Sequence, residues 1–266
     1  MTATPDQFTV HHDGVTIPVS RGGRGRPLVL CPGLMTTQVD LHELTHLLRR
    51  DFDVLTFDLR GHGLSSGAAH YSFTAFRGDF VAVMAELRRH GLPSAPVLVG
   101  HSLGADVIVH YAAEHPDDVA ELVLIDGANP VPEPFLTEAD MPWFRQLWEE
   151  LVSVHETARG TPRQMLLTVQ QILDINVELD VIRSGILDRY RDIDCPIRMI
   201  MSASMAGDSE DERVGRYNRN WRAGIERLAR ERPRNAVSWL DADHGLVVTH
   251  ASPLAEIIRG RGHPAV

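Results

Sequence analysis

Residues 96–104 read Pro-Val-Leu-Val-Gly-His-Ser-Leu-Gly, in which an apolar run is followed by a serine between two glycines. A short apolar run leads into Ser102, which stands between Gly100 and Gly104, and a pattern of helical period follows over 103–114. Glycines have no Cβ atom, so the chain can turn sharply here from a strand into a helix. Such a turn lifts the serine Oγ above the end of the strand and points backbone N–H groups toward it. We therefore predict that Ser102 is a nucleophile at the edge of a sheet.

Six other short apolar runs are also typical of strands. They cover 15–20, 27–31, 53–57, 122–125, 197–201 and 236–240. Stretches of helical period lie between most of them, for example at 41–49 and 76–89. The alternation of strands and helices at this spacing predicts an α/β fold with a mainly parallel central sheet. Functional residues are then expected at the carboxyl ends of the strands.

Two segments depart from this alternation. Residues 21–25 read Arg-Gly-Gly-Arg-Gly and predict the turn of an N-terminal antiparallel hairpin. Residues 129–194 carry no strand signal but contain five prolines and several amphipathic stretches. The helices expected there cover 143–154, 163–175 and 177–189. We predict that 129–194 forms a helical cap, inserted into a core that is built from residues 1–128 and 195–266.

The composition excludes several kinds of chemistry and partner. None of the 266 residues is lysine, so mechanisms that need a lysine side chain, such as Schiff-base catalysis by its amine, are ruled out. A formal net charge of −10 opposes contact with a phosphate backbone, and no nucleic-acid partner is expected. The first residues lack the features of a signal peptide, and no apolar run approaches membrane-spanning length. These features indicate a cytoplasmic protein without a membrane partner, and they leave a homodimer open.

A serine nucleophile needs a base, and a histidine is the residue that most often supplies it. His244 follows the apolar run 236–240 in the sequence Asp-Ala-Asp-His-Gly. Residues 58–65 read Asp-Leu-Arg-Gly-His-Gly-Leu-Ser, a D-x-R-G-x-G-x-S pattern. With the serine turn, these features resemble the α/β-hydrolase superfamily, in its lid-bearing, epoxide-hydrolase-like branch, over nearly the whole chain. The resemblance implies an α/β-hydrolase fold and a triad in the order serine, acid, histidine, in which His244 is the expected base.

The resemblance also implies an oxyanion hole made by two backbone N–H groups. One belongs to Leu103, the residue after the nucleophile, and the other to Leu34 in the loop after the run 27–31, with Met35 as the alternative donor. Members of the family usually have His-Gly in this loop, where the present chain has Pro32-Gly33. The proline stiffens the loop, but a side-chain hydrogen bond that would brace it is lost.

Two aspartates compete for the place of the triad acid. The family's usual G-x-x-D turn after the run 197–201 is broken here, since Asp208 comes several residues late and no glycine stands at the expected place. Asp126 directly follows the run 122–125, and its position resembles that of the acid in zearalenone-type resorcylic macrolide lactonases. We favour Asp126 and keep Asp208 as the alternative. Either carboxylate would accept from the histidine Nδ1–H and hold the ring in the required tautomer.

A metal-binding pattern also occurs in the chain. Residues 42–46 read His-Glu-Leu-Thr-His, which matches the H-E-x-x-H motif of zinc metalloproteases. The extended motif that would supply a third ligand is missing. Leu41, Leu44 and Leu48 mark the buried face of this helix, which leaves both histidines toward solvent. We therefore predict neither a metal site nor a cofactor.

The predicted cap carries large apolar side chains that favour a hydrophobic substrate. They are Met141, Trp143, Phe144, Trp148, Met165, Leu166 and Leu167, of which we expect Trp143 and Trp148 to bind substrate. We predict a serine hydrolase that cleaves an ester or lactone of a medium-sized hydrophobic small molecule through an acyl-enzyme on Ser102. Carbon–carbon bond hydrolysis, perhydrolysis, acyl transfer and ligand binding with little turnover remain alternatives.

Overall fold

The chain folds around a single eight-stranded sheet in the computed structural model, which describes residues 6–260. The strands lie in the order β1-β2-β4-β3-β5-β6-β7-β8. β3 to β8 run parallel, while β1 and β2 pair antiparallel and β2 pairs antiparallel with β4. The strands are β1 (Asp6–His12), β2 (Val15–Gly23), β3 (Arg26–Cys31), β4 (Phe52–Phe57), β5 (Val97–His101), β6 (Glu121–Ile125), β7 (Ile197–Ser202) and β8 (Ala236–Leu240). The predicted α/β fold with a mainly parallel sheet is confirmed.

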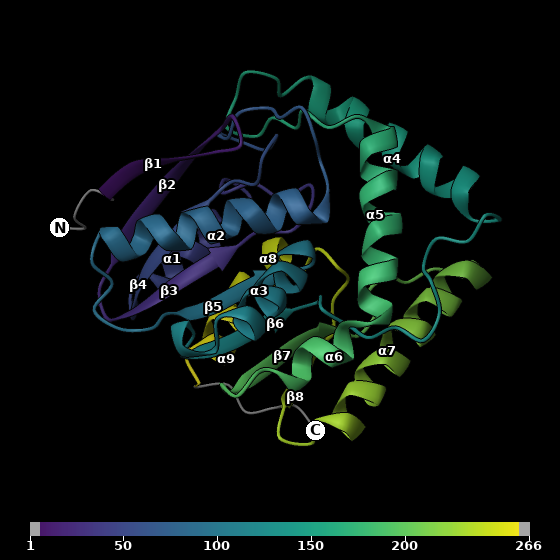
Figure 1. Ribbon diagram of the computed structural model, residues 1–266. Helices are drawn as coiled ribbons and strands as arrows, with labels where there is room; N and C mark the ends of the chain where they lie inside the picture. The colour runs from purple at the N-terminus through teal and green to yellow at the C-terminus, as the bar shows by residue number, and fades with distance from the viewer. Residues whose placement is uncertain (1–5, 261–266) are drawn as a thin grey trace.

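Helices cover both faces of the sheet (Figure 1). They are α1 (His42–Leu48), α2 (Phe73–Arg89), α3 (Leu103–Glu114), α4 (Met141–Glu156), α5 (Val169–Ser184), α6 (Ile186–Arg191), α7 (Glu212–Glu231), α8 (Leu246–Thr249) and α9 (Ala251–Ile258), with a short 3₁₀ helix at Pro116–Asp118. No helix of residues 6–260 is long and apolar enough to span a membrane.

The central parallel strands are apolar at most positions because both of their faces pack against helices. In β3, Leu28 and Leu30 belong to the core under α1, α8 and α9, while Val29 and Cys31 belong to the core under α2 and α3. The same two-residue period continues in the neighbouring strands β5 and β6. Two cores on opposite faces therefore fix the register of the central strands and the place where each of them ends.

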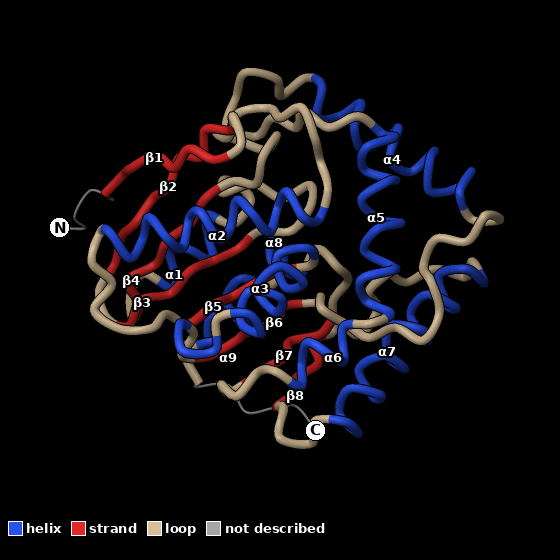
Figure 2. Tube along the Cα trace, in the orientation of Figure 1, coloured by secondary structure: helices blue, strands red, loops and turns tan. Residues whose placement is uncertain are grey.

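The chain leaves the sheet after β6 and returns only at β7. Residues between these strands form α4, α5 and α6 together with long loops (Figure 2). α4 and α5 lie beyond the end of the sheet to which the β3 arrow points (Figure 1). Side chains of α4 and α5 consequently stand above the carboxyl ends of the parallel strands, where functional residues are expected.

The structure corrects two expectations about local structure. The N-terminal hairpin turns at Asp13 and Gly14, whereas the glycine-rich residues 21–23 belong to β2 and pair with β4. Gly23 is needed inside the strand because a Cβ there would lie 2.1 Å from the carbonyl oxygen of Phe52. The predicted helix 163–175 begins only at Val169, after Thr168, whose side chain caps the helix through a reciprocal pair of hydrogen bonds with Gln171.

Candidate active site

Ser102 occupies a sharp turn between β5 and α3. Its backbone has φ 50° and ψ −121°, a strained conformation for a residue with a Cβ atom. The flanking glycines are required by close approach, since a Cβ on Gly100 would lie 2.5 Å from the carbonyl oxygen of Gly104. A Cβ on Gly104 would lie 2.3 Å from the carbonyl oxygen of Cys31. The turn is therefore compressed against β3, and this packing holds the serine in its strained backbone conformation.

Ser102, His244 and Asp126 form one hydrogen-bonded chain. The Oγ of Ser102 lies 2.9 Å from Nε2 of His244. On the other side of the ring, Nδ1 of His244 lies 2.7 Å from Oδ2 of Asp126. The three residues come from the ends of β5, β8 and β6, so the parallel sheet gathers them at one edge. In this arrangement Nδ1–H donates to the carboxylate, and Nε2 accepts from the serine hydroxyl.

The carboxylate of Asp126 has a buried set of donors that the sequence did not indicate. It is fully buried, and its Oδ1 accepts from the backbone N–H of Ser202 and from Nε1 of Trp221 at 3.1 and 2.8 Å. Its Oδ2 accepts from the Ser202 hydroxyl at 2.6 Å as well as from His244. Burial acts to raise the pKa of Asp126, but hydrogen bonds from His244 and Ser202 outweigh it and lower this pKa below its usual value. The group is thus an anion at neutral pH.

Asp208, the alternative acid, lies elsewhere. It is exposed, in the loop between β7 and α7, while the Nδ1 of His244 faces Asp126. The same loop does hold the histidine through its backbone, because His244 N–H donates to the carbonyl oxygen of Met205 at 3.2 Å. His101, beside the nucleophile, is buried, and its Nε2 lies 3.1 Å from the backbone oxygen of His244. His101 thus supports the loop of His244 and takes no place in the hydrogen-bonded chain.

The two expected oxyanion donors lie beside Ser102. Leu103 is the first residue of α3, where a backbone N–H has no partner within the helix. Leu34 lines the same cavity as Ser102. The N–H of Met35, the alternative donor, is engaged, because it donates to Nε2 of His62 at 3.1 Å. The loop lacks a histidine at position 32, but the side chain of His62 braces it instead.

The cavity above Ser102 has an apolar wall and a polar one. Its volume is about 640 Å³. The apolar wall belongs to α4, and the polar wall belongs to one face of α5, where the residues are spaced by three and four. The α4 residues are Trp143, Phe144, Leu147, Trp148 and Leu151, and the polar α5 residues are Asn176, Asp180 and Arg183. Trp143 and Trp148 thus line the cavity, whereas Met165 and Leu167 are buried outside its lining.

The H-E-x-x-H residues lie on the surface of α1 and do not line the cavity above Ser102. His42, Glu43 and His46 are exposed on α1, whose buried residues include Leu44 and Leu48. The two imidazole rings are 6.5 Å apart between centroids and stack on the helix surface. Across residues 6–260, no group of three or more His, Cys, Asp or Glu side chains is placed to hold a metal ion.

We predict that the protein loses stability in mild acid because three of its histidines are buried. Burial lowers the pKa of His62 to about 4, of His101 to about 3 and of His110 to about 4. In the unfolded chain these groups take up protons near pH 6.5, and in the folded protein only at lower pH. The free energy of unfolding should therefore fall as the pH drops from about 6.5 toward 4. Urea unfolding at pH 7.5, 6.0, 5.0 and 4.5 measures this loss, and equal stability at all four values contradicts the prediction.

Comparisons with known proteins agree with the fold. The family model for the alpha/beta hydrolase fold matches residues 26–163, just over half of the chain. N-formylmaleamate deformylase of Pseudomonas putida is 33% identical over 125 residues, which are 46% of this chain and 45% of that protein. 2-(Acetamidomethylene)succinate hydrolase of Mesorhizobium japonicum is 28% identical over 196 residues, 72% of this chain and 65% of that protein.

A solved structure extends the similarity in fold to nearly the whole chain. The crystal structure of an E-2-(acetamidomethylene)succinate hydrolase superposes with a TM-score of 0.70 at 20% identity, covering 96% of this chain and 98% of that one. The sequence matches to the curated relatives are shorter, since the chain spans about half to two thirds of their length. The serine turn, the sheet order and the family match lead to one conclusion: the chain belongs to the α/β-hydrolase superfamily.

Proposed function

We propose that the protein is a serine hydrolase that cleaves a carboxylic ester or lactone through an acyl-enzyme on Ser102. One observation carries the proposal, the unbroken hydrogen-bonded chain from Ser102 through His244 to the ionised Asp126. The strained backbone at Ser102 adds support, because such strain concentrates at functional sites. A structural role alone would need neither the strain nor a partly exposed histidine side chain beside a fully buried carboxylate.

The reaction follows from the roles of these three groups. His244 Nε2 removes the proton from the Ser102 hydroxyl as its Oγ attacks the carbonyl carbon. Asp126 stabilises the imidazolium that forms, and the N–H groups of Leu34 and Leu103 hold the negative oxygen. The intermediate collapses when His244 returns the proton to the leaving alkoxide. Water, activated by His244, then attacks the acyl-enzyme and releases the acid.

We propose that α4, α5 and α6 act as a cap that selects the substrate. α4 has no buried residue of its own, although it presents aromatic side chains to the cavity above Ser102. The apolar surface that such a helix exposes to a cavity becomes buried when a ligand fills the space. The hydrocarbon part of the acyl group or of the alcohol would therefore lie against Trp143 and Trp148.

The charges around the cavity favour an uncharged substrate. Arg183 is the cation in the cavity lining, and its Nε and Nη2 already donate to the buried Asp106 at 3.1 and 2.6 Å. Asp180 and Asp243 also line the cavity, and Asp126 lies behind His244. Carboxylates thus outnumber the guanidinium, so an anionic substrate would be repelled. The Nη1 of Arg183 donates to no group of residues 6–260, so it can still donate to a neutral carbonyl or hydroxyl oxygen.

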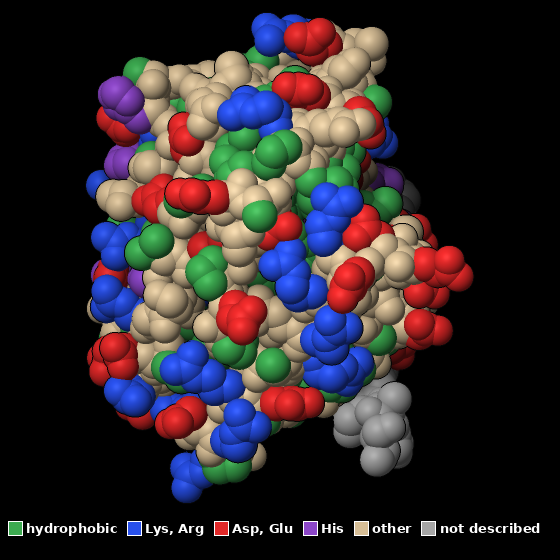
Figure 3. All heavy atoms as spheres, turned by 90° about the vertical axis from the view of Figure 1, so that its right-hand side faces the viewer, with side chains coloured by type: hydrophobic (Ala, Val, Ile, Leu, Met, Phe, Trp, Pro, Cys, Tyr) green, Lys and Arg blue, Asp and Glu red, His purple; other side chains and the backbone are tan. Residues whose placement is uncertain are grey.

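Arginines near the cavity do not reverse this balance. Arg213 pairs with Asp211, and Arg216 pairs with Asp140, at 2.9 and 2.7 Å. Figure 3 shows arginine and acidic side chains interspersed over the side of the molecule that carries α4 and α7, with apolar side chains between them. An approaching substrate therefore meets mixed charge on this face and net negative charge inside the cavity.

A matched pair of esters tests the preference for uncharged substrates. Methyl p-nitrophenyl glutarate and mono-p-nitrophenyl glutarate differ only in whether the far end is neutral or a carboxylate. We expect kcat/KM for the neutral ester to be higher by about tenfold or more, equivalent to about 1.4 kcal/mol of repulsion, and the difference to shrink at high salt. A panel of medium-chain esters and lactones, assayed with both compounds, then identifies the acyl length and ring size.

The opposite preference would indicate a different substrate class. The names of the two relatives denote carboxylate-bearing amides, so a higher kcat/KM for the anionic ester would assign this chain to such small acids. Lack of hydrolysis of every ester and lactone, together with a Ser102 that reacts with a fluorophosphonate, would instead favour an acyl transfer or carbon–carbon cleavage reaction at the same serine.

A further inference from the structure

His62 is a fully buried histidine that uses both ring nitrogens. Its Nε2 lies 3.1 Å from the backbone N of Met35, and its Nδ1 lies 2.9 Å from the carbonyl oxygen of Arg60. Met35 N–H can only donate, and the Arg60 carbonyl can only accept. These partners therefore fix one neutral tautomer, with the proton on Nδ1. Burial lowers the pKa of His62 to about 4, which keeps this neutral form at physiological pH.

The hydrogen bond from Met35 holds the loop that carries Leu34. Met35 has φ 63°, a left-handed conformation that a residue with a long side chain adopts only when other contacts impose it. On the other side of Leu34, Gly33 is packed so closely that a Cβ would lie 3.0 Å from Cβ of Ser102. Leu34 thus stands between one residue pressed against the nucleophile and another that is held by His62. These two restraints direct the Leu34 N–H.

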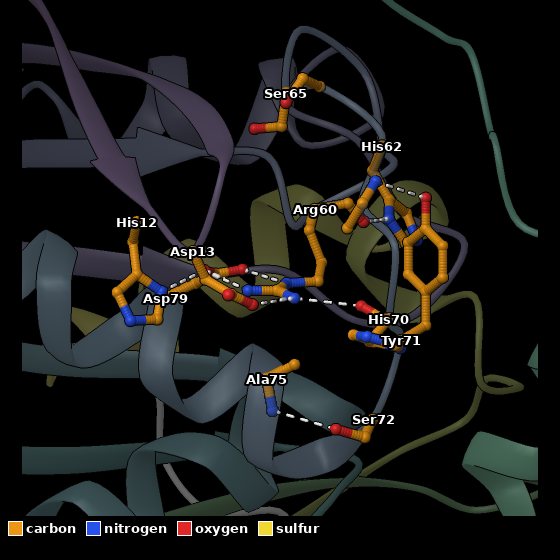
Figure 4. A network of polar contacts seen from close by, with 12 residues as sticks. His12, Asp13, Arg60, His62, Ser65, His70, Tyr71, Ser72, Ala75 and Asp79 are labelled. Carbon is orange, nitrogen blue, oxygen red and sulfur yellow. Dashed lines mark hydrogen bonds and ion pairs between the residues drawn. The ribbon is translucent and has the colours of Figure 1, made fainter.

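The turn that carries His62 is itself held on several sides. Gly63 N–H donates to the carbonyl oxygen of Gln164, and Leu166 N–H donates to that of Gly61, at 2.9 and 2.8 Å. These bonds join the turn to the segment between α4 and α5. On the opposite side, Arg60 is fully buried and donates through Nε and Nη2 to the carboxylate of Asp79, as Figure 4 shows. His62 therefore projects from a rigid support.

A second set of hydrogen bonds joins the turn that carries His62 to the loop that carries Leu34. Asp58 is almost fully buried, and its carboxylate accepts from Gln38 N–H at 2.7 Å and from Leu64 N–H at 2.9 Å. Asp58 ties the far end of the loop, while His62 reaches the residue next to Leu34. The contact that is nearest to the expected oxyanion donor is thus the one that His62 makes.

We propose that His62 is a positioning residue for the oxyanion hole. It holds Met35 N–H and thereby aims the adjacent Leu34 N–H at the place where negative charge develops. The inference rests on the proposed function, since an oxyanion forms only if Ser102 attacks a carbonyl. It also assigns a role to the segment between α4 and α5, which supports the His62 turn from the side of the proposed cap.

Two variants that differ by one methylene separate positioning from simple structural support. His62→Gln places an amide oxygen near the position of Nε2, where it can accept from Met35 N–H. His62→Asn reaches only the Nδ1 position and keeps the bond to the Arg60 carbonyl. We expect His62→Asn to lower kcat by about 10²-fold, the scale of a misaimed catalytic group, with KM changed by less than about threefold, and His62→Gln to recover most of the rate.

The concentration of active sites is determined for each variant before the rates are compared. Fluorophosphonate titration of Ser102 gives the concentration of folded, reactive enzyme in each variant, and kcat is expressed per titrated serine. Affinity for a boronic acid, which mimics the tetrahedral intermediate, should fall in His62→Asn in proportion to kcat/KM. His110→Leu is the matched control, because His110 is likewise a buried histidine with a lowered pKa, and it should keep kcat.

Each outcome bears on one of the two proposals. A wild-type protein that neither hydrolyses esters nor reacts with the fluorophosphonate overturns the proposed function. An active wild type, with equal kcat per titrated serine and equal boronate affinity in His62→Asn and His62→Gln, overturns the role of His62. A fall in melting temperature alone, shared by His62→Asn and His110→Leu at unchanged kcat, also overturns it.

Discussion

Ser102→Ala is expected to abolish turnover, with a fall in kcat of about 10⁶-fold and no loss of folding. The serine Oγ is the atom that would form the acyl bond, and no other hydroxyl lies within hydrogen-bond distance of His244 Nε2 among residues 6–260. Alanine keeps the Cβ atom and therefore the packing of the turn, so the variant removes chemistry without opening a cavity. Ester hydrolysis and covalent labelling by a fluorophosphonate should disappear together.

The control for this variant is a serine outside the cavity. Ser153 is exposed on α4, and Ser153→Ala should label and hydrolyse like the wild type. Substrate binding offers a second check, since Ser102→Ala keeps the cavity and should still bind an uncharged ester with an affinity near the wild-type value. Labelling of Ser102→Ala at the wild-type rate would show that another residue is the nucleophile, and the proposed mechanism would fail.

The sequence predicted those parts of the molecule that depend on neighbouring residues. The serine turn needs only an apolar strand, two glycines and a helix, all within residues 96–114, and it is found as expected. The predicted position of the hairpin turn was wrong because a glycine such as Gly23 suits a close approach of β4 as well as a turn, and the sequence does not say which strand lies beside β2. Pairing between distant strands decides such positions.

The polar contacts of the candidate site could not be predicted from the sequence for the same reason. Ser202 and Trp221 contact Asp126 across 76 and 95 residues of sequence, and neither belongs to a recognisable motif. His62 stands within the D-x-R-G-x-G-x-S pattern, but its bond to Met35 depends on how two loops meet. Short-range patterns thus locate the ends of the strands, while the hydrogen bonds that set charge and tautomer appear only when these ends are brought together.

Asp126→Asn is expected to lower kcat by about 10⁴-fold, whereas Asp208→Asn should stay within about twofold of the wild type. In Asp126→Asn the side-chain oxygen can still accept from Ser202 N–H and Trp221 Nε1, the partners of Oδ1. The amide nitrogen would then replace Oδ2, and a donor would face Nδ1 of His244. The ring must shift its proton to Nε2, where it can no longer accept from Ser102.

The two aspartate variants distinguish between the candidate acids. Loss of Asp126 removes both the correct tautomer and the anion that stabilises the imidazolium, so kcat should fall while KM changes little. Asp208 is the matched control, because it is an exposed aspartate in the loop that holds His244 through backbone contacts. Steady-state kinetics with one uncharged ester, with folding checked by circular dichroism, compares the two variants directly. A larger loss in Asp208→Asn than in Asp126→Asn would assign the acid to Asp208 and would require the loop after β7 to move toward His244 during the reaction.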